Sequence, residues 1–290
     1  MKDDNNGILF ICATPIGNLE DVSFRLISTL KEADLILAED TRTIRKLLSR
    51  YEIKKKDLLS YHQHTDDAKL DHIIQLIRQG KKAALVSESG TPAIQDPGYR
   101  IINRCIGENI PVTVIPGPSA ALSALVLSGL PADSFLFIGF LPKTQAKRKK
   151  KLEEVSSLPY TLIFYESPKR IEKTVEDLIS ILGKRNAALA REVTKIYEEV
   201  LRGDLETILK EIKSRTIKGE IVLVVEGNKG ELIKEYSEQD IEKQFLQLIG
   251  EGLSKKNAMK IIKSRYDIDR QKLYNISTKF KLDNNKKRMR

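Results

Sequence analysis

The chain has 290 residues, of which 41% are hydrophobic and 31% charged, and Lys and Arg exceed Asp and Glu by 10 at pH 7. This length allows one large domain or two smaller ones, and the absence of any run of about 18 apolar residues argues against a membrane span. The polar start, residues 1–6, lacks the apolar core of a signal peptide, so we expect a cytoplasmic protein. Cys12 and Cys105 stand in apolar surroundings without CxxC spacing, which predicts buried free thiols and no metal site.

The positive charge is concentrated in two places. Residues 229–290 contain 16 Lys and Arg against 9 Asp and Glu, which gives +7 of the total excess. A second block comprises Lys143 and Lys147–Lys151 and contains no acid. Such patches favour a polyanionic partner, because neutralised phosphates release counterions. A solvated lysine-rich surface is the alternative.

The first strand is expected at Ile8–Ala13, an apolar run that ends in a loop with Pro15 and Gly17. No GxGxxG pattern follows, so a nicotinamide-type fingerprint is missing. A second strand at Leu35–Ala38 ends in the charged residues Glu39, Asp40, Thr41 and Arg42. Acids at the end of a buried strand need a cleft or a cationic partner, and Arg42 can provide the latter as a purely structural ion pair.

Two of the three histidines, His62 and His64, follow in an HxH pattern. On a strand both rings would lie on one face, but no further ligands have zinc spacing, so we favour histidines of a substrate cleft over metal ligands. A helix is expected at Asp67–Gln79, because Leu70, Ile73, Ile74 and Ile77 recur at helical spacing before Gly80.

Two loops have the character of ligand-binding loops. Ala83–Val86 predicts a strand that ends in SESGTPAIQDPG, and Val112–Ile115 predicts another that ends in PGPSA. In an open α/β sheet, ligands bind beyond the carboxyl ends of the strands, and glycine lets the backbone approach them closely. We therefore expect both loops to meet at one ligand, with tight strand-to-helix turns as the alternative.

The remaining chain predicts two further units. We place a domain boundary after residue 141, so that residues 1–141 and 142–228 form two α/β domains that face each other. Residues 229–281 carry only helical patterns and resemble a small helix-turn-helix unit, although a dimerisation element is equally compatible. Residues 282–290 have the composition of a disordered basic tail.

Several motifs occur together in a specific order: ATPIGNLED, AEDTR, VSESGTPAIQDPGY, PGPSAALSAL, GFLP, FYESPKR and REVTKIYEE. In this combination the chain resembles the ribosomal RNA small-subunit methyltransferase I family of the tetrapyrrole-methylase superfamily, from about Leu9 to Glu226. The resemblance implies the class III fold of S-adenosylmethionine-dependent methyltransferases, with a cofactor cleft between two α/β domains. One departure is that Glu88 replaces the Asp of the family's SDAGTP loop, which lengthens the acid by one methylene.

The resemblance also implies an activity and a set of cofactor positions. The implied reaction is 2′-O-methylation of a cytidine ribose in the decoding region of 16S rRNA, within the 30S subunit, by a homodimer. Carried over by motif, the S-adenosylmethionine-binding residues are Pro15, Glu88, Thr91, Ser119, Ala120, Tyr165, Glu220 and Ile221.

The chemistry limits the catalytic candidates. A ribose hydroxyl is a weak nucleophile at neutral pH, so it needs alignment and a group that accepts or relays its proton. An acid beside a cation can do this, and the candidate pairs are Asp40 with Arg42 and Glu192 with Lys195. For both pairs a structural ion pair is the alternative.

The RNA-binding candidates are the residues of the basic block, Lys147, Arg148, Lys149, Lys150 and Lys151. Two other functions stay open at this point. One is a methylase of the same superfamily that acts on a small corrin precursor, and the other is a non-catalytic RNA-binding protein.

Overall fold

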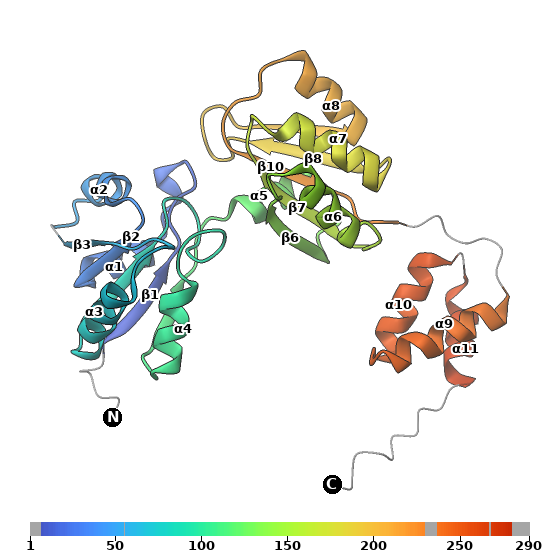
Figure 1. The fold of residues 1–290 in the computed structure, drawn as a ribbon, viewed down its shortest axis with the longest axis horizontal. Helices are drawn as coiled ribbons and strands as arrows, with labels where there is room; N and C mark the ends of the chain where they lie inside the picture. The colour runs from blue at the N-terminus through green and yellow to red at the C-terminus, as the bar shows by residue number, and fades with distance from the viewer. Residues whose placement is uncertain (1–6, 55, 230–236, 267, 280–290) are drawn as a thin grey trace, which may run out of the picture.

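The computed structural model describes residues 7–54, 56–229, 237–266 and 268–279. It contains two five-stranded sheets with helices packed on them, followed by three helices that form a unit of their own (Figure 1). This arrangement confirms the predicted class of two α/β parts and a helical C-terminal part. The basic tail at residues 282–290 lies outside the described residues.

The first sheet is parallel, with the strand order β3-β2-β4-β1-β5. Its strands are β1 (Ile8–Cys12), β2 (Leu35–Ala38), β3 (Asp57–Ser60), β4 (Lys82–Val86) and β5 (Val112–Ile115). The helices are α1 (Phe24–Glu32), α2 (Thr41–Arg50), α3 (Asp67–Arg78) and α4 (Tyr99–Gly107). Because α1 and α2 cover one face and α3 and α4 the other, the central strands are buried on both faces and consist of continuous apolar runs.

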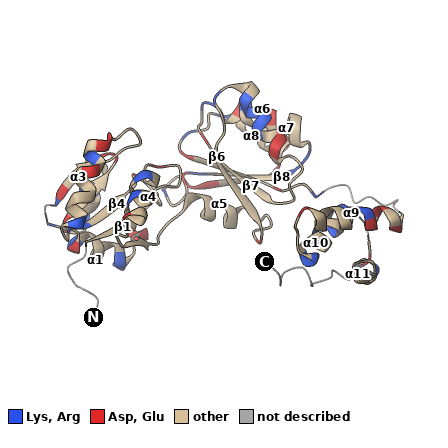
Figure 2. Ribbon diagram, turned by 60° about the horizontal axis from the view of Figure 1, so that its bottom comes forward, with Lys and Arg blue, Asp and Glu red and all other residues tan. Residues whose placement is uncertain are grey.

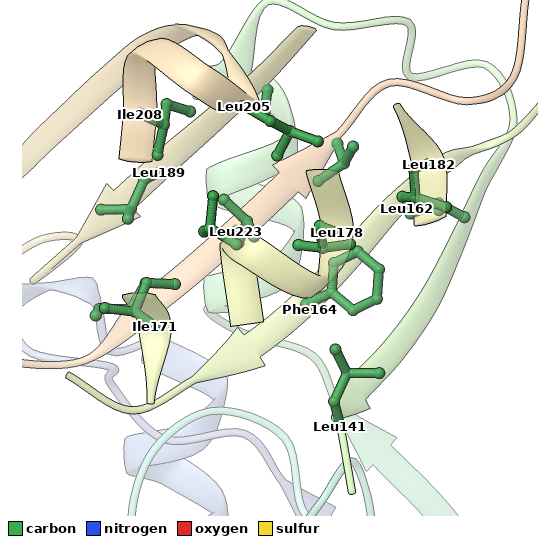
Figure 3. Close-up of a cluster of buried hydrophobic side chains, with 14 of the residues drawn as sticks. Leu141, Leu162, Phe164, Ile171, Leu178, Leu182, Leu189, Leu205, Ile208 and Leu223 are labelled. Atoms are coloured by element: carbon green, nitrogen blue, oxygen red, sulfur yellow. The ribbon is translucent and has the colours of Figure 1, made fainter. Parts of the chain in front are cut away.

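The second sheet is mixed, with the order β6-β7-β10-β8-β9, and only β6 and β7 are parallel. Its strands are β6 (Phe135–Phe140), β7 (Thr161–Glu166), β8 (Asn186–Arg191), β9 (Glu199–Asp204) and β10 (Ile221–Val225). One face is covered by α6 (Gln145–Val155), α7 (Ile171–Leu182) and α8 (Leu205–Ser214). The fully buried Phe164 lies among leucines and isoleucines of this core (Figure 3).

The structure corrects the domain boundary expected after residue 141. Strand β6 pairs with β7, and α5 (Ala120–Ser128) packs its alanines against Ile163, Val222 and Val224 on the open face of the second sheet. Both elements precede the predicted boundary but belong to the second sheet. The physical reason is that sheet membership depends on pairing with a distant strand, which the local pattern does not contain.

The C-terminal unit consists of α9 (Glu238–Gly250), α10 (Lys255–Arg265) and α11 (Arg270–Lys279). Ser237 begins α9 with a reciprocal capping box, and Ser254 accepts the backbone N–H of Asn257 at the start of α10. The three helices share a separate core that includes Ile241, Phe245 and Ile262. Among the helices of the described residues, none is long and apolar enough to cross a membrane.

Candidate active site

The topology of the first sheet creates a site where β1 and β4 end side by side. The chain leaves β1 through α1 on one face of the sheet and leaves β4 through α4 on the other face. Two neighbouring strands whose connections diverge in this way form a topological switch point, where open α/β sheets bind ligands. The two loops beyond these strand ends are therefore the natural walls of a ligand site.

Hydrogen bonds fix these two loops to each other. Thr14 and Gly90 form an antiparallel bridge, with N to O distances of 2.9 and 3.1 Å. The Thr14 hydroxyl donates to the Ser87 carbonyl at 3.2 Å, and the Ser87 hydroxyl donates to the Gly90 carbonyl at 2.8 Å. Gly90 has φ +80°, a conformation that glycine adopts without a Cβ clash. The loops are thus held in one defined arrangement before any ligand binds.

A pocket of about 480 Å³ lies beyond these strand ends. Its volume is in the range of small-molecule and cofactor sites. The first-sheet loops contribute Glu88, Thr91 and Asp96, the start of α5 contributes Ser119, and the second sheet contributes Tyr165 from β7. Both α/β parts therefore line one pocket.

Aromatic rings form the second-sheet wall of this pocket. Tyr165 packs edge-on against Phe137, with ring centroids 5.0 Å apart, and against Phe140 at 5.6 Å. Both Tyr165 and Phe140 line the pocket. Aromatic walls of this kind provide an apolar surface for a planar ring system such as a nucleobase.

Carboxylates dominate the charge of the pocket. Its lining includes Glu88, Asp96, Glu166 and Glu220 but no Lys or Arg among the described residues. Glu166 is neutralised by Arg170 at 3.4 Å, and Glu220 by Lys195 at 3.2 Å. Among the described residues, Glu88 and Asp96 have no such ion pair within 4 Å, so they leave negative charge at the pocket.

Asp96 has an unusual ionisation. Burial, and then the negative charges of Glu39 and Glu88, raises the pKa of Asp96 to about 6. The loop that holds this carboxyl is strained, because Ala93 and Gln95 adopt φ +68° and +66°. A cation bound beside Asp96 would lower its pKa again, so the site as built favours a positively charged ligand.

Seven of the eight predicted cofactor residues line this pocket: Glu88, Thr91, Ser119, Ala120, Tyr165, Glu220 and Ile221. The eighth, Pro15, lines an adjoining pocket of about 280 Å³ that shares Ile16, Glu88, Ser89 and Glu220 with the first. The sequence interpretation did not select Gln95, Asp96, Phe140 or Gly219. Asp96 could have been selected from the sequence, because this acid lies in the loop SESGTPAIQDPG and directly precedes Pro97.

The first candidate catalytic pair is a local ion pair at the start of α2. The Asp40 carboxylate accepts the Arg42 backbone N–H at 2.8 Å and the guanidinium at 2.7 Å. These bonds lower the pKa of Asp40 to about 2, which makes it a weak proton acceptor at neutral pH. This geometry matches the alternative of a structural ion pair, while Arg42 itself is largely exposed.

The second candidate pair belongs to a network that reaches both pockets. Lys195 Nζ lies 3.0 Å from Glu192 Oε1 and 3.2 Å from Glu220 Oε2. Lys195 lines the adjoining pocket, while Glu220 lines both pockets. Burial lowers the pKa of Lys195, but its hydrogen bonds to Glu192 and Glu220 and the charges of these carboxylates outweigh burial and raise the pKa overall, so the ammonium group stays charged. Lys195 also packs on Gly17, where a Cβ would lie 2.4 Å from its Cγ.

The basic block on α6 requires one correction. Arg148 is buried and binds Asp177 of α7 at 2.6 Å, so its charge is not offered to a partner. The reason is the helical period, which turns Arg148 toward α7 while Lys147, Lys150 and Lys151 face solvent. Lysines and arginines mark α6 in Figure 2.

The histidines and cysteines lie apart from the pocket lining. Strand β3 ends at Ser60, so His62 and His64 stand in an exposed loop and not on a strand. Cys12 and Cys105 are buried free thiols, as predicted, and burial raises their pKa values to about 12 and 11. Among the described residues, no group of three His, Cys, Asp or Glu side chains is arranged to hold a metal.

Comparison with known proteins agrees with this fold. The profile of the family described as Tetrapyrrole (Corrin/Porphyrin) Methylases matches residues 9–209. Among solved structures, the methyltransferase CobJ superposes with a TM-score of 0.58 at 18% identity, over 77% of this chain and 95% of that chain. A diphthine synthase superposes with a TM-score of 0.57 at 16% identity, over 76% and 89%. At these identities the structural likeness concerns the fold alone.

The fold and the matched profile define this chain as a member of the tetrapyrrole methylase family. Curated relatives then place it within that family. A protein of Halalkalibacterium halodurans is 46% identical over 94% of this chain and 95% of its own length, and one of Haemophilus influenzae is 42% identical over 93% and 96%. Both are named ribosomal RNA small subunit methyltransferase I. This chain belongs with them and is an S-adenosylmethionine-dependent methyltransferase.

The residues present fit S-adenosylmethionine. This molecule carries a sulfonium and an ammonium group, which suit the carboxylates of Glu88 and Asp96, and an adenine ring, which suits the wall of Tyr165 and Phe140. When bound, it supplies an electrophilic methyl group, which is attached to its positively charged sulfur. The acid-lined pocket is therefore chemically suited to this cofactor.

Proposed function

We propose that this protein methylates the ribose 2′-hydroxyl of a cytidine in the decoding region of small-subunit ribosomal RNA, with S-adenosylmethionine in the acid-lined pocket. The observation that carries this proposal is the adjoining pocket, because it shares Glu88 and Glu220 with the first and is lined by Lys195. A substrate group in the adjoining pocket would face the cofactor across this shared boundary. The eight cofactor positions carried over from the resemblance are part of this proposal: seven line the acid-lined pocket, and Pro15 lies in the adjoining pocket next to Ile16, which lines both.

Lys195 is the residue that we assign to the reacting hydroxyl. Its ammonium group is fixed by Glu192 and Glu220, and it can donate a hydrogen bond to the ribose oxygen as negative charge develops there. The bound cofactor would supply the methyl group to this oxygen, and the hydroxyl proton would pass to a neighbouring carboxylate or to water. Glu192 positions Lys195, because its carboxylate also accepts the Glu220 backbone N–H at 2.9 Å.

Exposed positive charge supports an RNA substrate over a small one. Lys147, Lys150 and Lys151 face solvent on α6, and Arg42, which is exposed and paired with Asp40, is close enough to Glu88 to be affected by its charge. Such groups suit phosphates that flank a target nucleotide, and folded RNA presents its 2′-hydroxyls in shallow grooves and splayed loops. The homodimeric state, the assembled 30S particle as substrate and a cytoplasmic location remain predictions.

The test is methyl transfer to purified 30S particles that lack this modification, with radiolabelled S-adenosylmethionine and mass spectrometry of the digested rRNA. We expect one labelled nucleoside, 2′-O-methylcytidine, and a matched reaction with Lys195→Met should be slow while cofactor affinity is retained. A label on a base, or transfer only to a corrin precursor offered in parallel, would refute the proposed reaction.

A further inference from the structure

The C-terminal unit has a strongly polarised charge. Helix α9 carries three acids against one lysine, whereas α10 carries five Lys and Arg and α11 three, with no acid in either. Solvation alone does not require such segregation, since interspersed charges keep a surface equally soluble. The basic side of this unit therefore indicates a negatively charged partner.

A groove between α10 and α11 gathers these charges. It has a volume of about 690 Å³. Its cationic lining residues are Lys255, Lys256, Lys260, Lys263 and Arg270, and no carboxylate is among its described lining residues. Tyr274 also lines the groove, with 54% of the residue exposed. Positive charge and an accessible aromatic ring thus share one concave surface.

The core of the unit does not require these cations, although Lys260 lies 3.8 Å from Asp133. The inner sides of α10 and α11 supply the core through Ala258, Ile262, Leu273 and Ile276. Lys255 and Lys256 occupy the first turn of α10, where positive charge opposes the helix dipole and reduces helix stability. Helix stability therefore does not explain the lysine at position 256.

One of the curated relatives is shorter than this chain. A ribosomal RNA small subunit methyltransferase I of Thermotoga maritima is 42% identical over 99% of its own length but only 76% of this chain. Nearly the whole of that relative is thus matched by about three quarters of this chain, so a relative of this name does not need a chain of this length.

We propose that the groove between α10 and α11 binds a single-stranded or looped segment of RNA. Lys256, Lys263 and Arg270 would contact phosphates, and Tyr274 would stack on one base. Grooves that combine cations with an exposed aromatic ring bind single strands in this way, with little dependence on sequence. The proposal rests on the proposed function, and it assigns this unit to substrate affinity outside the catalytic pocket.

The first test neutralises the groove in the full chain. We compare Lys256→Gln/Lys263→Gln with a control of equal charge change, Lys173→Gln/Lys210→Gln, whose lysines are exposed on α7 and α8. The probe is a short fluorescein-labelled oligouridine, titrated by anisotropy at several salt concentrations. Loss of two phosphate contacts should make the log–log salt slope shallower by about 1.4 in the groove variant, relative to the control.

The second test concerns stacking and separates RNA from an acidic peptide. Tyr274→Leu should weaken oligouridine binding at least about fivefold, whereas Tyr274→Phe should bind like the wild type, because a phenyl ring also stacks. A polyglutamate competitor depends on charge alone and should not distinguish these two variants. Equal oligouridine affinity for Tyr274→Leu and the wild type would overturn the stacking assignment.

The outcomes for the groove and for the reaction are distinguishable. If the wild type methylates 30S particles and the groove and control variants have equal salt slopes and KM values, the groove proposal is wrong while the proposed function stands. If the groove variants lose oligouridine binding but the wild type methylates no ribosomal RNA, the proposed function fails instead. S-adenosylmethionine affinity, measured by calorimetry, should be the same in every variant.

Discussion

The raised pKa of Asp96 predicts a pH dependence of cofactor binding. The free protein holds this carboxyl with a pKa of about 6, so it is mostly ionised at pH 7 and mostly protonated at pH 5. If only the ionised form binds the cation well, the apparent Kd equals the intrinsic Kd divided by the ionised fraction. That fraction falls from about 0.9 to about 0.09, so S-adenosylmethionine should bind about tenfold more weakly at pH 5.

Folding stability should change in the opposite direction at this residue. The folded-state pKa is raised above the ordinary value of 3.8, so the folded protein favours the protonated carboxyl. Its contribution to stability is fully present below the ordinary pKa and is lost as the pH rises through about 6. Weaker cofactor binding at pH 5 therefore cannot be explained by acid unfolding through Asp96.

The assay is calorimetry of S-adenosylmethionine binding at pH 7 and pH 5, with wild type and Asp96→Asn. The amide cannot ionise, so the variant should bind at pH 7 at least as weakly as the wild type binds at pH 5, and its Kd should change little between the two pH values. A tenfold pH effect that persists in Asp96→Asn would show that another group titrates, with Glu39 and Glu88 as the nearest candidates. No pH effect in the wild type would refute the reasoning.

Three further predictions concern packing, the pocket and the network. Arg148→Ala should lower the free energy of unfolding by about 3–5 kcal/mol, because it leaves the Asp177 carboxylate buried without its main partner, whereas Lys150→Ala should change it by less than about 0.5 kcal/mol in the same denaturant titration. Thr91→Trp should abolish S-adenosylmethionine binding in calorimetry while the circular dichroism spectrum stays unchanged, since the indole would fill the pocket. Unaltered affinity would show that the cofactor binds elsewhere. Lys195→Met should reduce kcat for methyl transfer by about 100-fold or more with cofactor binding no weaker than in the wild type, because the change leaves the Glu220 carboxylate without its ion pair, and a normal kcat would show that Lys195 has no part in the mechanism.

The sequence by itself determined the local elements and their ends. Apolar runs such as Leu35–Ala38 predicted strands because a strand buried on both faces has no polar positions, and the structure contains this strand with the same bounds. The loops at Glu88 and Ser119 were expected to meet because parallel strands end at one edge, and they line one pocket. Strand ends, loop residues and family motifs depend on residues that are adjacent in the sequence, so they could be predicted.

Only the tertiary structure decided which distant groups meet. Strand β6 belongs to the second sheet because it pairs with β7. Arg148 is not part of the basic surface because it is buried in an ion pair with Asp177 of α7. The pKa of Asp96 is raised by burial and by the charges of Glu39 and Glu88. Lys195 belongs to the second α/β part but lines the adjoining pocket together with loops of the first. Strand pairing, burial and charge interactions act between residues far apart in the chain, so no local pattern contains them.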